Sequence, residues 1–135
     1  MEKSEIAIII PCFNEEKTII TVVKNASYYG IPIVVDDKST DKSIENLNKI
    51  QSEIIIKSND KNIGYEKTLQ VGFEIAHKNG FKYAITLDGD NQFNHTDIGS
   101  LINKSNNFDI VIAQRNKLQC KLFKDIKIKR LFKAS

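Results

Sequence analysis

Five short runs of apolar, mostly β-branched residues constrain the fold of this chain more strongly than any other feature of its sequence. Each run has the length of a strand, and segments with helical spacing of apolar residues separate the runs. Continuous apolar runs of this kind are typical of parallel strands that are buried on both faces. The predicted strands cover residues 6–10, 31–35, 53–57, 83–87 and 108–113. We therefore expect an α/β fold with a largely parallel sheet and helices on both faces.

Four amphipathic helices are predicted between these strands. Asn14 offers an N-cap for the first helix, with Glu15 in its first turn, where the helix dipole favours an acidic side chain. Residues 39–41 offer caps for the second helix, and Gly80 marks the end of the third. The apolar residues of the four helices are Ile19, Val22, Val23 and Ala26, then Ile44 and Leu47, then Tyr65, Leu69, Phe73 and Ala76, and finally Ile98, Leu101 and Ile102.

Polar residues gather where the predicted strands end. Residues 11–15 follow the first strand, residues 36–37 the second, residues 88–92 the fourth and residues 114–115 the fifth. In parallel α/β sheets, ligands bind beyond the carboxyl ends of the strands. Several carboxylates would then meet at one edge, where each would raise the pKa of the others. A divalent cation at this edge would relieve that repulsion.

The triplet Asp88-Gly89-Asp90 is the strongest single indication of a metal site. Two carboxylates one residue apart on a turn can reach one ion, and Gly89 would let the backbone turn tightly. Mg²⁺ and Mn²⁺ prefer oxygen ligands, and Mg²⁺ is usually held by one or two carboxylates together with substrate phosphates. The alternative is a simple turn, because Asp, Gly and Asn all favour turns.

Four motifs, in this order, give the sequence a resemblance to a known family. They are Pro11-Cys12-Phe13-Asn14-Glu15-Glu16, Val34-Val35-Asp36-Asp37-Lys38-Ser39-Thr40-Asp41, Asn62-Ile63-Gly64 and Leu87-Asp88-Gly89-Asp90-Asn91-Gln92. Together they resemble the inverting family 2 glycosyltransferases, which have the Rossmann-like GT-A fold. Within that family the sequence is most similar to the polyprenyl- or dolichyl-phosphate sugar synthases. The resemblance covers about residues 5–115.

The resemblance implies roles for particular residues. The donor would be a nucleoside-diphosphate sugar, linked to UDP or GDP. Phe13 would stack near the base, and Asp37 would hydrogen-bond the base. Asp90 and Arg115 would be the catalytic residues, with Arg115 in contact with phosphate. The residues implied to line the donor pocket are Pro11, Phe13, Glu15, Asp37 and Asp88, and those implied to hold Mg²⁺ or Mn²⁺ are Asp88, Asp90 and Gln92.

Three positions depart from the family pattern. Lys38 replaces the usual glycine after the Asp pair, so we expect a differently shaped turn there. Tyr65-Glu66-Lys67 replaces a small, often glycine-containing stretch, which we expect to alter the contacts to the sugar nucleotide. Ala113-Gln114 stands where Gly-Ser is typical. None of these changes removes an expected metal ligand.

Length also separates this chain from the family, whose domains are considerably longer. We expect the C-terminal half that builds the acceptor site to be truncated. One reading is a glycosyltransferase with a polyprenyl phosphate as the candidate acceptor, which is already an anion near neutral pH and needs no general base. The other is a non-catalytic nucleotide-binding remnant, or a subunit that needs a partner or a C-terminal half. A phosphoacceptor signalling domain is disfavoured, because a whole strand and helix precede Asp36.

Charge divides the chain into a predicted nucleotide-sugar-binding domain of residues 1–114, with a net charge of −4, and a tail of residues 115–135, with a net charge of +7. The helical spacing of Leu118, Leu122 and Ile126 among lysines predicts a basic amphipathic helix. Such a helix can lie on an anionic membrane; the alternative is a helix whose apolar face packs on the domain. No nucleic-acid partner is expected, because the domain lacks a basic groove with interleaved aromatic residues.

The remaining features concern the compartment. The N-terminus lacks a signal-peptide pattern, and no apolar run reaches the roughly 18–20 residues needed to cross a bilayer. Cys12 and Cys120 cannot form a disulfide framework, and Cys12 is expected to be buried. We therefore expect a cytoplasmic protein that contacts the inner face of the membrane peripherally.

Overall fold

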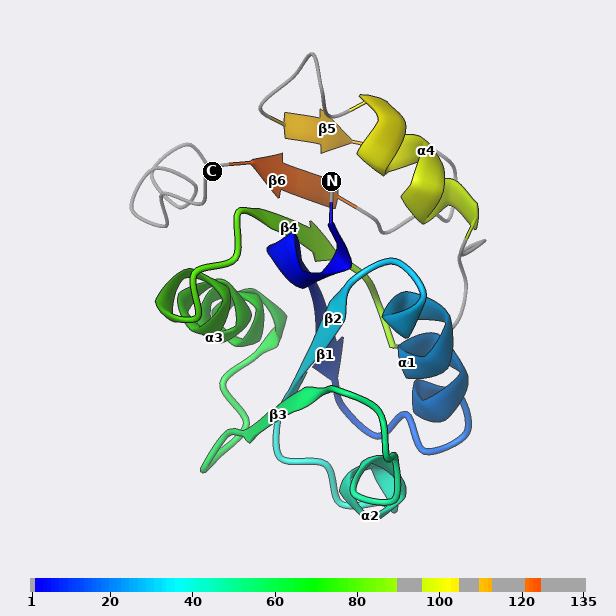
Figure 1. Ribbon diagram of the computed structural model, residues 1–135. Helices are drawn as coiled ribbons and strands as arrows, with labels where there is room; N and C mark the ends of the chain where they lie inside the picture. The colour runs from blue at the N-terminus through cyan, green and yellow to red at the C-terminus, as the bar shows by residue number, and fades with distance from the viewer. Residues whose placement is uncertain (1, 90–95, 105–109, 113–120, 125–135) are drawn as a thin grey trace.

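The computed structural model describes residues 2–89, 96–104, 110–112 and 121–124, and shows a sheet with helices on its two sides (Figure 1). A short 3-10 helix, Lys3–Glu5, precedes the first strand. The other elements, in chain order, are β1 (Ile6–Cys12), α1 (Ile19–Ser27), β2 (Ile31–Asp36), α2 (Ser43–Leu47), β3 (Ile55–Ser58), α3 (Tyr65–Lys78), β4 (Tyr83–Thr86), α4 (Thr96–Lys104), β5 (Ile110–Ile112) and β6 (Lys121–Lys124).

The sheet has the strand order β3-β2-β1-β4-β6-β5. The first four strands in this order run parallel, as the sequence predicts, whereas β6 runs antiparallel to both of its neighbours. The chain adds strands outward from β1 to β3 and then returns to place β4 on the other side of β1. This reversal makes the carboxyl ends of β1 and β4 a topological switch point, where open α/β sheets bind their ligands.

Strand β6 corrects one prediction. Lys121–Lys124 was expected to form part of a basic amphipathic helix, but these residues form a strand between β4 and β5. Apolar spacing over a short segment cannot distinguish a helix from a buried strand. Pairing with two strands decides the outcome here, since Ala84 pairs with Phe123 and Phe123 pairs with Ile110. The predicted boundary between residues 114 and 115 lies outside the described residues.

The side chains of β1 alternate between two apolar clusters, one on each face of the sheet. Ile8 and Ile10 pack in the cluster that contains α1, α2 and residues of α4. Ala7 and Ile9 pack on the opposite face, with residues of α3. Figure 1 shows the same division, with α3 on one side of the sheet and α1 and α4 on the other. Because β1 is buried on both faces, its apolar run has to be continuous.

The segment before α1 differs from the prediction. Asn14 was expected to cap this helix, but the helix begins at Ile19 and its N-cap residue is Thr18. Asn14 has a φ of 52°, in the left-handed region that Asn tolerates. Its side-chain oxygen accepts a hydrogen bond from the Thr40 N–H at 2.8 Å. The carboxamide therefore binds a neighbouring loop and does not cap α1, and the N–H of Ile19 at the start of this helix donates to the carbonyl oxygen of Glu15 instead.

No helix in the described ranges is both long and apolar enough to span a membrane.

Gly72 allows α3 to approach the sheet closely. A Cβ atom added at this residue would lie 2.3 Å from Cγ2 of Ile9, a distance that no side chain can occupy without displacing its neighbour. Ile9 is fully buried in the centre of the sheet, so it has little room to move.

We expect Gly72→Ala to destabilise the protein by about 1–3 kcal/mol, because the added methyl group overpacks the contact with Ile9. Gly99→Ala in α4 is the matched control, since a Cβ there would lie 3.5 Å from Cε1 of Tyr29, an ordinary contact. The higher helix propensity of Ala should make this control neutral or up to about 1 kcal/mol more stable. Urea denaturation measures both changes. Equal free energies of unfolding in the two variants would contradict the close packing at Gly72.

Candidate functional site

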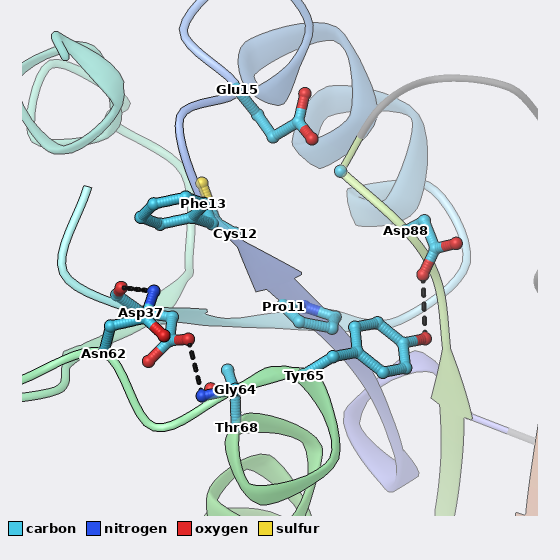
Figure 2. A pocket seen from close by; sticks show the side chains of 11 residues that line it. Pro11, Cys12, Phe13, Glu15, Asp37, Asn62, Gly64, Tyr65, Thr68 and Asp88 are labelled. Atoms are coloured by element: carbon cyan, nitrogen blue, oxygen red, sulfur yellow. Dashed lines mark hydrogen bonds between the residues drawn. The ribbon is translucent and has the colours of Figure 1, made fainter. Parts of the chain in front are cut away.

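A cavity of about 420 Å³ opens at the carboxyl ends of β1, β2 and β4 (Figure 2). It therefore lies at the switch point of the sheet. Its lining residues are Pro11, Cys12, Phe13, Glu15, Asp37, Asn62, Gly64, Tyr65, Thr68, Asp88 and Gly89. The structure thus brings together all five residues that the sequence placed in a donor pocket: Pro11, Phe13, Glu15, Asp37 and Asp88. Their roles toward a ligand remain predictions.

Asp37, directly after β2, holds the loop that leads into α3. Its carboxylate accepts hydrogen bonds from the backbone N–H of Ile63 at 2.8 Å and of Gly64 at 3.0 Å. Nδ2 of Asn59 donates a third, at 3.0 Å, and also approaches Oγ1 of Thr68. Gly64 has a φ of 92°, which a residue with a side chain rarely adopts. The buried carboxylate therefore fixes the geometry with which α3 enters the cavity.

These hydrogen bonds also set the charge of Asp37. Burial by itself raises its pKa, but the hydrogen bonds from Ile63, Asn59 and Gly64 outweigh burial, so the pKa lies below the ordinary value of 3.8. The side chain is therefore ionised at neutral pH. Three of the roughly four acceptor positions of a carboxylate are used within the protein. That leaves limited capacity for the predicted hydrogen bond to a base.

Asp36 serves a different loop from its neighbour Asp37. Its carboxylate accepts hydrogen bonds from the backbone N–H and the hydroxyl of Ser39. The Ser39 hydroxyl in turn accepts one from the backbone N–H of Asn14, and the Ser43 hydroxyl accepts one from the backbone N–H of Glu15. The loop after β2 is thereby attached to the loop after β1. Asp36 is thus a structural partner of the loop that follows β2.

Lys38 follows the two carboxylates in an uncommon conformation. Its φ of 66° lies in the left-handed region that glycine favours. The turn therefore keeps a glycine-like shape, where a different shape was expected. For a residue with a side chain this conformation costs roughly 1–2 kcal/mol.

Cys12 is a buried thiol at the end of β1, as the sequence predicts. Burial, together with the negative charge of Asp36, raises its pKa to about 12. The thiolate is the reactive form of cysteine. Cys12 therefore contributes packing and a cavity wall instead of a nucleophile.

Asp88 lies on the opposite side of the cavity from Phe13 and Asp37 in Figure 2, and the next residue, Gly89, also lines the cavity. The Tyr65 hydroxyl donates a hydrogen bond to Oδ1 of Asp88 at 2.9 Å. The Thr18 hydroxyl donates one to the carbonyl oxygen of Gly89 at 2.6 Å. Gly89 lies in a turn after β4, as the sequence predicts. A Cβ added at Gly89 would lie 3.3 Å from the carbonyl oxygen of Pro11, a tight contact that favours glycine at this position.

The predicted metal site falls only partly within the described residues. Asp90, Gln92 and Arg115 lie outside them, as does Ala113-Gln114. Within the described ranges, no group of three or more His, Cys, Asp or Glu side chains is arranged to hold a metal ion. Asp88 and Glu15 do line the same cavity. Their hard oxygen donors suit Mg²⁺ or Mn²⁺.

Six of the eleven lining residues were not predicted as site residues, and Asn62, Thr68 and Tyr65 are among them. Asn62 was noted only as part of a motif, and its Nδ2 donates to the backbone carbonyl of Asp37 at 3.2 Å. Thr68 is buried at a position of α3 where an apolar residue would be usual. A polar residue at such a position was a signal in the sequence that could have indicated a site residue. Tyr65 was assigned to the apolar face of a helix, but 51% of it is exposed at the cavity.

The lowered pKa of Asp37 predicts a pH-dependent contribution to stability. Because the folded-state pKa lies below 3.8, ionised Asp37 stabilises the fold at higher pH, and this contribution is lost as the pH falls through the lowered pKa. Asp37→Asn should lower the free energy of unfolding by about 1–3 kcal/mol near neutral pH, since its amide cannot accept all three hydrogen bonds. The variant should lose less additional stability than the wild type between about pH 4 and pH 2.

Urea denaturation across this pH range is the measurement. Asp60→Asn is the matched control, because Asp60 is exposed in the same loop. This control should change the free energy of unfolding by at most about 0.5 kcal/mol. Parallel pH profiles for the wild type and Asp37→Asn would contradict the assigned role of the Asp37 carboxylate.

Comparison with sequence families adds to this geometry. The model of the family described as glycosyl transferase family 2 matches residues 7–133. The uncharacterized proteins MJ0544 and MJ1222 of Methanocaldococcus jannaschii are 37% and 32% identical to the chain. The alignments cover 79% and 85% of this chain, and 50% and 48% of those proteins. The chain thus spans about half the length of these relatives.

Solved structures share the fold at low sequence identity. S. aureus TarS 1–349 in complex with UDP-GlcNAc superimposes with a TM-score of 0.71 at 17% identity, covering 95% of this chain and 47% of that one. Glucosyl-3-phosphoglycerate synthase from Mycobacterium tuberculosis, in complex with Mn²⁺, UDP and glucosyl-3-phosphoglycerate, gives a TM-score of 0.65 at 17% identity, covering 84% and 45%. Because the family model spans nearly the whole sequence, the chain belongs to glycosyl transferase family 2.

Proposed function

We propose that the cavity binds a nucleoside-diphosphate sugar and that the chain is the donor-binding part of a glycosyltransferase. One observation carries the proposal: residues from the ends of three strands, predicted from the sequence as donor contacts, line one cavity at the switch point of the sheet. Membership of the family supports this assignment. So do the related folds, among them structures in complex with UDP and with UDP-GlcNAc.

Phe13 is the proposed contact for the base. Its side chain is 48% exposed although it is large and apolar, and it lines the cavity beside Asp37. An exposed aromatic ring at a cavity offers a surface on which a nucleobase can stack. Asp37 is proposed to act mainly by holding the loop of residues 59–64, with its remaining acceptor capacity available to the base.

Asp88, Asp90 and Gln92 are the residues proposed to hold Mg²⁺ or Mn²⁺. When bound, the cation would neutralise the pyrophosphate of the departing nucleotide. The Mn²⁺ in the complex of the related synthase supports this proposal. Glu15, on the same cavity, is proposed to contact the donor, and Arg115 to contact phosphate.

A polyprenyl phosphate is the proposed acceptor, supported by the resemblance of the motifs to the lipid-phosphate sugar synthases. Contact with the inner face of the membrane belongs to the same proposal. The amphipathic helix expected from residue 118 to residue 126 does not support it, because Lys121–Lys124 is a strand. The competing proposal is a chain that binds the donor but transfers sugar only with a partner or a C-terminal half.

Calorimetric titration with UDP and GDP, with and without Mn²⁺, tests donor binding. The wild type should bind at least one of these nucleotides, and more tightly with Mn²⁺. Phe13→Ala should weaken binding under both conditions by about 1–3 kcal/mol, the contribution of stacking one base on an aromatic ring. Asp88→Asn should instead remove the gain from Mn²⁺ while preserving the binding measured without it.

Tyr28→Phe is the matched control, since Tyr28 is 76% exposed and lies outside the cavity lining. This variant should bind as the wild type does. If the wild type binds neither nucleotide under either condition, the proposed function is wrong.

A radiolabelled nucleotide sugar incubated with the chain and liposomes containing polyprenyl phosphate tests the acceptor. We expect metal-dependent label in the lipid fraction, because the acceptor anion can attack without a general base. Label in a soluble sugar would contradict the lipid-phosphate acceptor. Donor binding without any transfer would instead favour the competing proposal, in which the chain transfers sugar only with a partner or a C-terminal half.

A further inference from the structure

The hydrogen bond between Tyr65 and Asp88 connects two elements that bound the cavity. Tyr65 is the first residue of α3, and Asp88 follows β4. The Tyr65 hydroxyl lies 2.9 Å from Oδ1 of Asp88, and Figure 2 shows the hydroxyl directed at the carboxylate. The bond is exposed to solvent, so its contribution to the stability of the fold is small.

Both ends of this contact are held in place by other interactions. The carboxylate of Asp37 binds the backbone N–H groups of Ile63 and Gly64, which fixes the start of α3 immediately before Tyr65. The Thr18 hydroxyl binds the carbonyl oxygen of Gly89, which fixes the main chain immediately after Asp88. The terminal torsion of an aspartate side chain is intrinsically broad, so the rotation of the Asp88 carboxylate has to be restricted by its hydrogen-bond partners.

A phenol is chemically suited to restrict that rotation beside a cation. It donates a single hydrogen bond and leaves the negative charge of the carboxylate intact, whereas a lysine in its place would repel the cation. It occupies only one of the roughly four acceptor positions of a carboxylate. Carboxylates that bind metals are commonly oriented by such a partner, and losing the partner weakens metal affinity by roughly 10–100-fold.

We propose that Tyr65 is a positioning residue, which holds the Asp88 carboxylate in the orientation that a divalent cation bound with the nucleotide requires. This inference rests on the proposed function, because it takes the cavity as the donor site. It also connects the two sides of the cavity. Asp37, on the side proposed for the base, fixes the start of α3, and Tyr65 at the start of this helix orients Asp88 on the other side.

The test is Tyr65→Phe in the full chain, which removes the hydroxyl and keeps the ring. Mn²⁺ is titrated into protein with excess UDP or GDP, and free Mn²⁺ is followed by electron paramagnetic resonance. We expect the Mn²⁺ affinity to fall by about tenfold or more. Nucleotide affinity without Mn²⁺ and the melting temperature should stay at the wild-type values, a combination that a purely structural role would not give.

Two further variants sharpen the result. Tyr28→Phe, the same change at an exposed tyrosine outside the cavity, should leave Mn²⁺ affinity unchanged. In an Asp88→Asn background, Tyr65→Phe should have no additional effect, because the hydroxyl acts only through the carboxylate.

The outcomes separate this inference from the proposed function. If the wild type binds the nucleotide with Mn²⁺ and Tyr65→Phe binds Mn²⁺ equally well, the positioning role is wrong and the proposed function stands. Tighter Mn²⁺ binding by Tyr65→Phe would show that the phenol competes with the cation, which also overturns the positioning role. If the wild type binds no nucleotide, the proposed function fails and this inference fails with it.

Discussion

Two consecutive buried carboxylates at the end of β2 hold the functional edge of this domain together. Successive side chains of a strand point to opposite faces of a sheet, and Asp36 and Asp37 accordingly serve different loops. Asp36 binds the loop at Ser39, whereas Asp37 binds the loop at Ile63 and Gly64. Each carboxylate is nearly inaccessible to solvent, so its charge is compensated by hydrogen bonds from the loop that it holds. The loops around the cavity therefore depend on one dipeptide.

The cavity follows from this arrangement. The Ser39 hydroxyl binds the backbone of Asn14, so the loop organised by Asp36 supports the loop that carries Phe13 and Glu15. The loop organised by Asp37 leads to Tyr65 and from there to Asp88. Side chains from three strand ends are thus oriented by main-chain and side-chain hydrogen bonds before any ligand arrives. Preorganisation of this kind reduces the ordering cost of binding.

The sequence predicts the central sheet well, because its strands are buried on both faces and their composition shows it. The continuous run in β1 is an example, with Ile8 and Ile10 on one face and Ile9 on the other. The five lining residues that the sequence placed in a donor pocket were predictable because strand ends meet at one edge and because four motifs resemble a family.

Contacts between distant segments were not predictable from local patterns. The Asn14 side chain binds a loop 26 residues further on, and Tyr65 binds a carboxylate 23 residues further on. For Lys121–Lys124, the short apolar pattern fits a helix and a strand equally well, and pairing with β4 and β5 decides between them.

The insertion of β6 between β4 and β5 has a consequence for the order in which the sheet can form. Strand β4 pairs with β1 on one edge and with β6 on the other, and β6 comes later in the chain than every other strand described. During synthesis on the ribosome, β1 to β4 emerge before the partner for the second edge of β4 is available. An unpaired strand edge is a template for pairing with other chains. The nascent protein therefore passes through an interval in which the second edge of β4 is unpaired, directly beside the residues that later face the cavity.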